Sequence, residues 1–197
     1  MNEIIKKQNN AVSNPLQKFI KKAAGTLPEQ TGAANHAINK MRMDRQVIIL
    51  DTSGSMAYTG AKLSRISELK VALEQVWSNQ TLIAFSNTAR EISSPLKIPT
   101  PQGGTALDKA FLLACRYDDL GHTLVISDGE PDDEDEALAA ASRLSGSIDI
   151  IYCGDPENQR AIDFMNALVR NRGKMVQHNW NGSLTLTQNI QKLLPAR

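Results

Sequence analysis

The segment Val47-Ile48-Ile49-Leu50-Asp51-Thr52-Ser53-Gly54-Ser55-Met56 joins an unbroken apolar run to a polar loop. Four apolar residues, three of them β-branched, indicate a strand that is buried on both faces, as in a parallel sheet. Asp51, Ser53 and Ser55 then follow at intervals of two residues, so their side chains point the same way in an extended chain. Gly54 lets the backbone turn, so that one carboxylate and two hydroxyls converge. These are hard oxygen ligands, which suit Mg²⁺ or a similar ion.

Strand-like and helix-like patterns alternate along the chain from this segment onward. Strands are expected at 47–51, 81–86, 122–127, 148–153 and 174–179, with a shorter edge strand near 90–94. Helices are expected over 62–77, from 103–105 to about 117, and over 133–145, 157–171 and 184–194. Strands separated by helices of about 10–15 residues predict right-handed crossovers. The fold class is therefore α/β, a doubly wound and mostly parallel sheet with helices on both faces.

Two later loops carry oxygen ligands of the same kind. Asp128 follows the strand at 122–127, and Thr105 begins a helix after two glycines that allow a close backbone approach. Ligands bind beyond the carboxyl ends of parallel strands, where the strand order reverses. The candidate metal ligands are therefore Asp51, Ser53, Ser55, Thr105 and Asp128. Taken alone, the first loop would equally fit a polar turn with Ser55 or Thr59 near a helix start.

The three loops together resemble the metal-ion-dependent adhesion site (MIDAS) of von Willebrand factor A (VWA) domains. The motifs are Asp51-Thr-Ser53-Gly-Ser55, Gly104-Thr105 and Asp128-Gly129, and the resemblance extends from residue 47 to about residue 195. It implies a six-stranded, Rossmann-like sheet with one antiparallel edge strand. It also implies bound Mg²⁺ or Mn²⁺, with Ser53 and Ser55 as direct ligands. Thr105, Asp51 and Asp128 would ligate directly or through water.

The resemblance also implies a function in protein binding rather than catalysis. Neutral hydroxyl ligands leave the cation with much of its charge, and an open coordination position would accept an Asp or Glu from a partner protein. Intracellular relatives commonly work with larger machines, so an adaptor role beside an ATPase of the AAA+ class is a further expectation. Nothing in the ligand set is a nucleophile with an adjacent base, so the site is expected to be non-catalytic.

The chain is expected to contain an N-terminal extension over 1–40 and a VWA domain over 41–197. Residues 1–28 are basic, with Lys6, Lys7, Lys18, Lys21 and Lys22 against Glu3. Asn14-Pro15 predicts a helix start, and Leu16, Phe19 and Ile20 share one face of a short amphipathic helix. Residues 25–40 are predicted to form a linker. The helix either packs on the domain or docks on a partner or an acidic surface.

Composition excludes several classes of protein. The chain has 197 residues, 41% of them hydrophobic and 22% charged, with a net charge of +1. This near-neutral balance gives no global attraction to nucleic acid or anionic lipid. No apolar run is long enough for a membrane span or a signal peptide, so a cytoplasmic location is expected. Cys115 and Cys153 are then expected to be buried thiols, and His36, His122 and His178 to be surface or structural residues.

The sequence leaves two alternative functions open. One is a nucleic-acid-associated scaffold that uses the basic N-terminal arm. The other is a metal-dependent phosphohydrolase, which the sequence disfavours: residues 54–63 miss the phosphate-binding P-loop spacing, and Ser53 stands where a phosphatase with Asp51 as nucleophile would need a second carboxylate.

Two further segments carry weaker expectations. Seven of the nine residues from Asp128 to Glu136 are acidic. They either complement a helix N-terminus or form a rim that selects partners with basic flanks. The helix at 184–194 is expected to cover the sheet, and in some relatives of the family the last helix moves when the metal site is occupied by ligand.

Overall fold

The computed structural model describes residues 46–58, 63–117, 121–182 and 184–194 of the chain. The strands are β1 (Gln46–Asp51), β2 (Thr81–Phe85), β3 (Ala89–Ile92), β4 (His122–Ser127), β5 (Ser147–Tyr152) and β6 (Met175–Gln177). The helices are α3 (Arg65–Val76), α4 (Leu107–Ala114), α5 (Glu134–Ala141), α6 (Gln159–Leu168) and α7 (Leu186–Leu193). Short 3₁₀ turns, η1 to η3, lie at Gly54–Ala57, Pro95–Lys97 and Cys115–Tyr117.

The six strands form one sheet in the order β3-β2-β1-β4-β5-β6. Every neighbouring pair is parallel except β2 and β3, so β3 is an antiparallel edge strand. The α/β class, the mostly parallel sheet, the edge strand near 90–94 and the one antiparallel edge strand implied by the resemblance are therefore confirmed, and the structure shows that the last two are the same strand. The chain winds outward from β1 through β2 in one direction and through β4 in the other, which places the topological switch point between β1 and β4.

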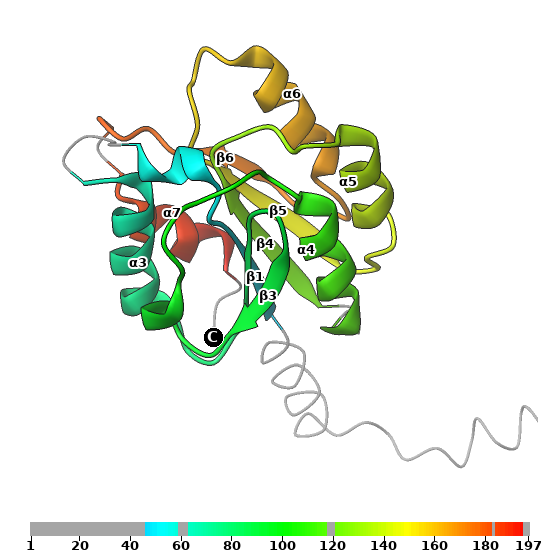
Figure 1. The fold of residues 1–197 in the computed structure, drawn as a ribbon, viewed down its shortest axis with the longest axis horizontal. Coiled ribbons are helices and arrows are strands. Elements are labelled where there is room, and N and C mark those ends of the chain that lie inside the picture. The colour runs from blue at the N-terminus through cyan, green and yellow to red at the C-terminus, as the bar shows by residue number, and fades with distance from the viewer. Residues whose placement is uncertain (1–45, 59–62, 118–120, 183, 195–197) are drawn as a thin grey trace, which may run out of the picture. The chain divides into compact units, whose positions relative to one another are not determined.

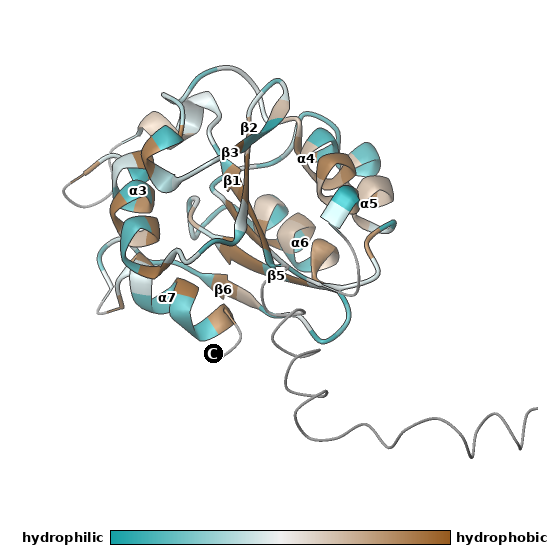
Figure 2. Ribbon diagram, turned by 90° about the horizontal axis from the view of Figure 1, so that it is seen from below, coloured by the Kyte–Doolittle hydropathy of each residue, from teal (hydrophilic) through white to brown (hydrophobic). Residues whose placement is uncertain are grey.

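Helices cover both faces of the sheet (Figure 1), with α4, α5 and α6 on one face and α3 and α7 on the other. The alternation of β1 explains this: Val47 and Ile49 enter the first core cluster, whereas Ile48 and Leu50 enter the second. All six residues of β1 are buried. Figure 2 shows the same pattern as hydrophobic strands between helices with one polar side. Burial on both faces accounts for the uninterrupted apolar run in the sequence.

The helices are shorter than the sequence pattern predicts, because capping residues set their ends. Helix α3 begins at Arg65 rather than near 62, since the Ser64 side chain accepts a hydrogen bond from Ser67 N. Leu63, expected on the buried face, precedes the helix and is 47% exposed. Helix α7 begins after a capping box formed by Thr185 and Gln188. Asp133 and Asn158 cap the starts of α5 and α6 in the same way. The expected end of α4 near 117 is the end of the 3₁₀ turn η3, and α5 and α6 end at Ala141 and Leu168, before the expected 145 and 171.

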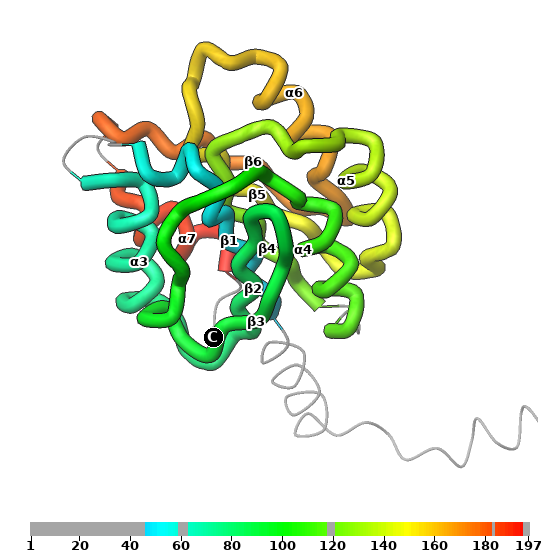
Figure 3. The backbone as a smooth tube through the Cα atoms, in the orientation of Figure 1, coloured from blue at the N-terminus to red at the C-terminus, as the bar shows by residue number. Residues whose placement is uncertain are grey.

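The connection from β3 to α4 crosses from one face of the sheet to the other. After η2, the chain passes Ile98, which lies in the core cluster of α3 and α7. It then crosses above the carboxyl ends of the strands to reach α4, as the tube in Figure 3 shows. On the way, Gln102 N donates to Thr52 O at 3.0 Å, and Gly54 N donates to Gly103 O at 3.1 Å. These two hydrogen bonds hold the loop against the loop that follows β1.

The predicted N-terminal extension, its amphipathic helix and His36 lie outside the described residues. The boundary between 40 and 41, the docking of that helix and the nucleic-acid hypothesis that depends on it therefore stay predictions. Within the described ranges, no helix combines the length and the apolar character that crossing a bilayer requires.

Candidate metal centre

The site lies at the carboxyl ends of β1 and β4, at the switch point of the sheet. Asp51 is the last residue of β1, and Asp128 comes directly after Ser127, the last residue of β4. Asp51 is 0% exposed and Asp128 is 6% exposed. Two buried carboxylates thus lie at the ends of neighbouring strands.

Three of the predicted ligands form a continuous chain of oxygens. Ser53 Oγ lies 3.0 Å from Ser55 Oγ, and Ser55 Oγ donates to Asp128 Oδ1 at 2.8 Å. Mg²⁺ binds oxygen at about 2.0–2.1 Å, so neighbouring ligands of its octahedron lie about 2.9 Å apart. The observed spacings match adjacent ligand positions, and this donor set fits a small, hard cation. Among the described residues no group of three or more His, Cys, Asp and Glu side chains is placed to hold a metal.

Asp51 is held from two sides rather than pointing freely into the site. Its Oδ1 accepts Ser53 N at 2.8 Å, and its Oδ2 accepts the Ser127 hydroxyl at 2.5 Å. Burial raises the pKa of Asp51 to about 6, and the nearby Asp128 carboxylate adds to the rise, while the hydrogen bonds from Ser127 and Ser53 oppose it. Because two buried carboxylates repel each other, a cation between them would stabilise both charges.

Thr105 reaches the same edge of the sheet on the loop before α4. Two side chains that the sequence analysis did not assign to the site fix this loop: Gly104 N donates to Asn87 Oδ1 at 2.5 Å, and Thr105 N donates to Asp132 Oδ1 at 3.0 Å. Asp132 N returns a hydrogen bond to Thr105 O at 3.0 Å. Thr105 comes two residues after Gly103, whose carbonyl oxygen accepts the hydrogen bond from Gly54 N in the Ser53–Ser55 loop.

The two glycines before Thr105 are required by this close packing. Gly103 has φ +74°, which favours glycine. A Cβ on Gly104 would lie 2.7 Å and 2.8 Å from the two carboxylate oxygens of Asp132 and 3.0 Å from Asn87 Oδ1. Both side chains that position the loop would have to move.

Gly104→Ala is therefore expected to loosen the Thr105 loop. Losing the hydrogen bonds that Gly104 N and Thr105 N donate to Asn87 and Asp132 should cost about 1–2 kcal/mol of unfolding free energy and lower Mg²⁺ affinity by roughly tenfold. Gly129→Ala is the matched control on the same rim, because a Cβ there meets nothing within 4 Å. Thermal unfolding and calorimetric Mg²⁺ titration of both variants check this, and equal behaviour of the two would contradict it.

The acidic run from Asp128 to Glu136 divides into parts with different roles. Asp128 lies in the site, and Asp132 holds the Thr105 loop, although the sequence placed Asp132 at the helix start. Asp133 is the N-cap of α5 and accepts Glu136 N at 2.9 Å. The remaining acidic residues of the first turn complement the helix dipole, as predicted.

Arg65 is a component of the site that sequence reasoning missed. It is the first residue of α3, and its Nη1 pairs with Asp128 Oδ2. The available signal was weak, because an arginine fourteen residues after the end of β1, in an amphipathic helix, is usually a solvated surface charge. Only the folded chain shows that it turns toward the carboxyl end of β4.

The other residues singled out in the sequence have structural surroundings. His122 Nε2 lies 2.6 Å from Asp149 Oδ2, and His178 Nδ1 lies 3.1 Å from Asn189 Nδ2. Each ring keeps one buried nitrogen without a hydrogen bond among the described residues. Cys153 is buried as expected, and burial raises the pKa of its thiol, whereas Cys115 is half-buried.

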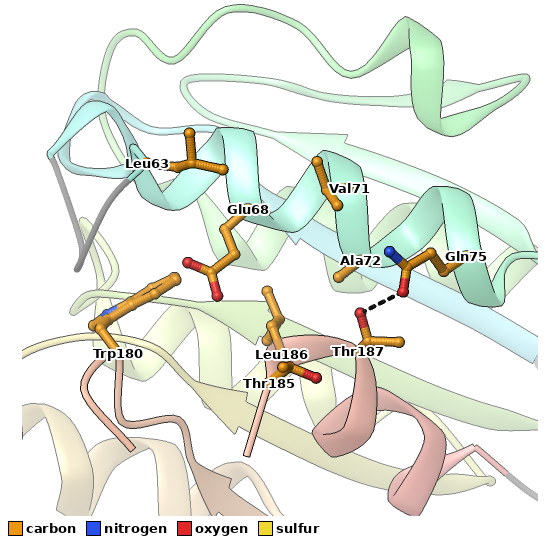
Figure 4. A pocket seen from close by; sticks show the side chains of 9 residues that line it. All are labelled: Leu63, Glu68, Val71, Ala72, Gln75, Trp180, Thr185, Leu186 and Thr187. Atoms are coloured by element: carbon orange, nitrogen blue, oxygen red, sulfur yellow. Dashed lines mark hydrogen bonds between the residues drawn. The ribbon is translucent and has the colours of Figure 1, made fainter. Parts of the chain in front are cut away.

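A groove of about 400 Å³ lies between α3 and α7 (Figure 4). Trp180 and Glu68 line one end, and a 3.2 Å hydrogen bond from Thr187 to Gln75 crosses the other. Below it, Leu186, Ile190 and Leu193 bury α7 against the sheet, so this helix covers the sheet as predicted. Its movement on ligand binding stays a prediction.

Comparison with known proteins bears on the fold. No protein-family model and no curated protein matches the sequence. Among solved structures, a von Willebrand factor type A protein from Catenulispora acidiphila matches at 20% identity and TM-score 0.58, covering 76% of this chain and 41% of that one. The manganese-loaded TRAP protein of Plasmodium vivax matches at 20% identity and TM-score 0.50, covering 69% of this chain and 68% of that one. This chain thus spans about two fifths of the first protein, and its described part has the fold of a von Willebrand factor A domain.

Proposed function

We propose that the protein is a metal-dependent protein-interaction module. Asp51, Ser53, Ser55, Thr105 and Asp128 would hold Mg²⁺ or Mn²⁺ at the carboxyl edge of the sheet. The observation that carries this proposal is the oxygen chain Ser53–Ser55–Asp128, with spacings of 3.0 Å and 2.8 Å. The manganese bound by the Plasmodium vivax protein of the same fold supports a divalent cation.

The chemistry of the donors favours ligand binding over catalysis. Two of the five side chains are carboxylates and three are neutral hydroxyls, so the bound cation would keep part of its charge and attract a further anion. An Asp or Glu side chain of a partner protein would supply it. The exposed acidic residues at the start of α5 would then favour partners with basic residues beside that carboxylate.

The partner class rests on the family resemblance alone. An accessory role beside an AAA+ ATPase in the cytoplasm is our proposal for the assembly, with no catalysis by this chain. Phosphatase and ATPase assays of the purified protein with Mg²⁺ check the last point. Turnover that Ser53→Ala abolishes would contradict it and favour the phosphohydrolase alternative.

Metal binding is expected to stabilise the fold. At a free Mg²⁺ concentration 100 times its Kd, binding to the native state adds about 2.7 kcal/mol. For a chain of this size each kcal/mol raises Tm by about 2–4 °C, so a rise of about 5–10 °C is expected. Thermal unfolding in MgCl₂, in MnCl₂ and in EDTA at constant ionic strength measures it. Equal Tm values in all three solutions would contradict the metal site.

A further inference from the structure

Arg65 pairs with Asp128, one of the two carboxylates that would hold the cation in the proposed metal site. Asp128 has a fully buried side chain, and its two oxygens are both engaged, Oδ1 by the Ser55 hydroxyl and Oδ2 by the Arg65 guanidinium. The Arg65 side chain is itself only 17% exposed. A guanidinium therefore neutralises the same carboxylate that the proposed cation would contact.

This arrangement has a clear electrostatic reason. A buried carboxylate without a partner is strongly destabilising, and Asp51 adds a second buried negative charge nearby. Arg65 supplies one compensating positive charge when no cation is bound. When a cation enters, the guanidinium and the dication are like charges beside one carboxylate, and their repulsion in a poorly solvated site is large.

Arg65 also has an alternative position close at hand. Its Cζ lies 5.9 Å from the centroid of the Tyr58 ring, which is 66% exposed. Arg65 Nε is buried and forms no hydrogen bond within the part of the chain that the structure describes. The side chain is thus anchored mainly through its contact with Asp128, and moving it outward over Tyr58 would keep a cation–π contact while returning the charge to water.

We propose that Arg65 is an internal counter-ion that competes with the divalent cation for Asp128 and so weakens metal binding. The inference rests on the proposed metal site and adds its regulation: the metal-free fold is stabilised by Arg65, and cation binding requires the guanidinium to leave Oδ2. A site built in this way has a lower apparent cation affinity, so half-filling needs a higher cation concentration than it would without Arg65. A purely positioning role for Arg65 would have the opposite consequence, because removing it would then weaken metal binding.

The test compares Arg65→Met with the wild-type protein by calorimetric titration of Mg²⁺ and Mn²⁺. The variant is expected to bind the cation about tenfold more tightly, because the competing charge is gone. In EDTA it should have a lower Tm than the wild type, since Asp128 loses its partner. Saturating Mg²⁺ should remove most of that difference. Arg65→Gln keeps a hydrogen-bond donor for Asp128 and should also bind the cation more tightly. It tests the inference if Arg65→Met fails to fold.

Arg160→Met is the matched control for a general charge effect. Arg160 is 73% exposed and pairs with Glu130 and Glu134 on the acidic rim near the site. Its removal should leave cation affinity within about twofold of the wild type, because surface charges are screened. An equal gain in Arg160→Met, or unchanged or weaker binding in both Arg65 variants, would overturn the inference. Absence of binding in the wild type and in both Arg65 variants would instead overturn the metal site itself.

Discussion

Replacing Ser53 with alanine is expected to lower Mg²⁺ affinity by about 100-fold or more and to abolish any metal-dependent partner binding. Losing a residue that only supports a ligand already costs 10–100-fold, so losing a ligand should cost at least as much. The fold should survive, because the Ser53 hydroxyl contacts Ser55 Oγ, which keeps its own bond to Asp128. Calorimetric titration and thermal unfolding in EDTA measure the two effects separately.

Thr52→Val is the control for losing a hydroxyl beside the site. Thr52 Oγ1 donates to Phe85 O at 2.7 Å, away from the candidate ligands, so this variant should lose about 1 kcal/mol of stability and keep its cation affinity. Unchanged Mg²⁺ binding in Ser53→Ala would show that Ser53 is not a ligand. Asp128→Ala is a poorer test than Ser53→Ala, because it also leaves the largely buried charge of Arg65 unpaired.

Replacing Phe111 with alanine is expected to cost about 3–5 kcal/mol of unfolding free energy. Phe111 on α4 is 0% exposed and lies in the core cluster beneath α4, α5 and α6. Truncation would remove a large buried apolar surface and leave a cavity that the rigid sheet cannot fill. Because natural domains are stabilised by only about 5–15 kcal/mol, the variant should be partly unfolded at moderate temperature. Urea denaturation monitored by circular dichroism measures the change.

Leu112→Ala, at the next position of the same helix, is the matched control. Leu112 is 43% exposed, so its truncation should cost less than about 1 kcal/mol. Similar losses in the two variants would mean that α4 does not pack on the sheet as the structure shows. Both measurements belong in EDTA, because bound cation would add its own stabilisation to each variant.

Much of the fold could be predicted because its signals are local. The apolar run of β1 indicated burial on both faces, and the alternation of strands with helices indicated parallel pairing. The weaker segment near 90–94 was correctly predicted as an edge strand, and the structure shows that it spans Ala89–Ile92 and pairs antiparallel with β2. Helix ends were less predictable, since a cap such as Ser64 or Thr185 is recognisable only when its side chain is seen to accept a backbone N–H.

The sequence by itself determined the fold class and supplied the candidate ligand set, because hydrophobic period and ligand type are properties of short segments; metal binding by these side chains stays a prediction. Only the tertiary structure decided which other side chains approach the site: Arg65 on Asp128, Asp132 and Asn87 on the Thr105 loop, and Ser127 on Asp51. The physical reason is that charge and hydrogen-bond partners separated by 17 to 76 residues meet only when the strands pair and the loops pack. The spacing of these residues along the sequence does not indicate which of them lie close together in the folded protein.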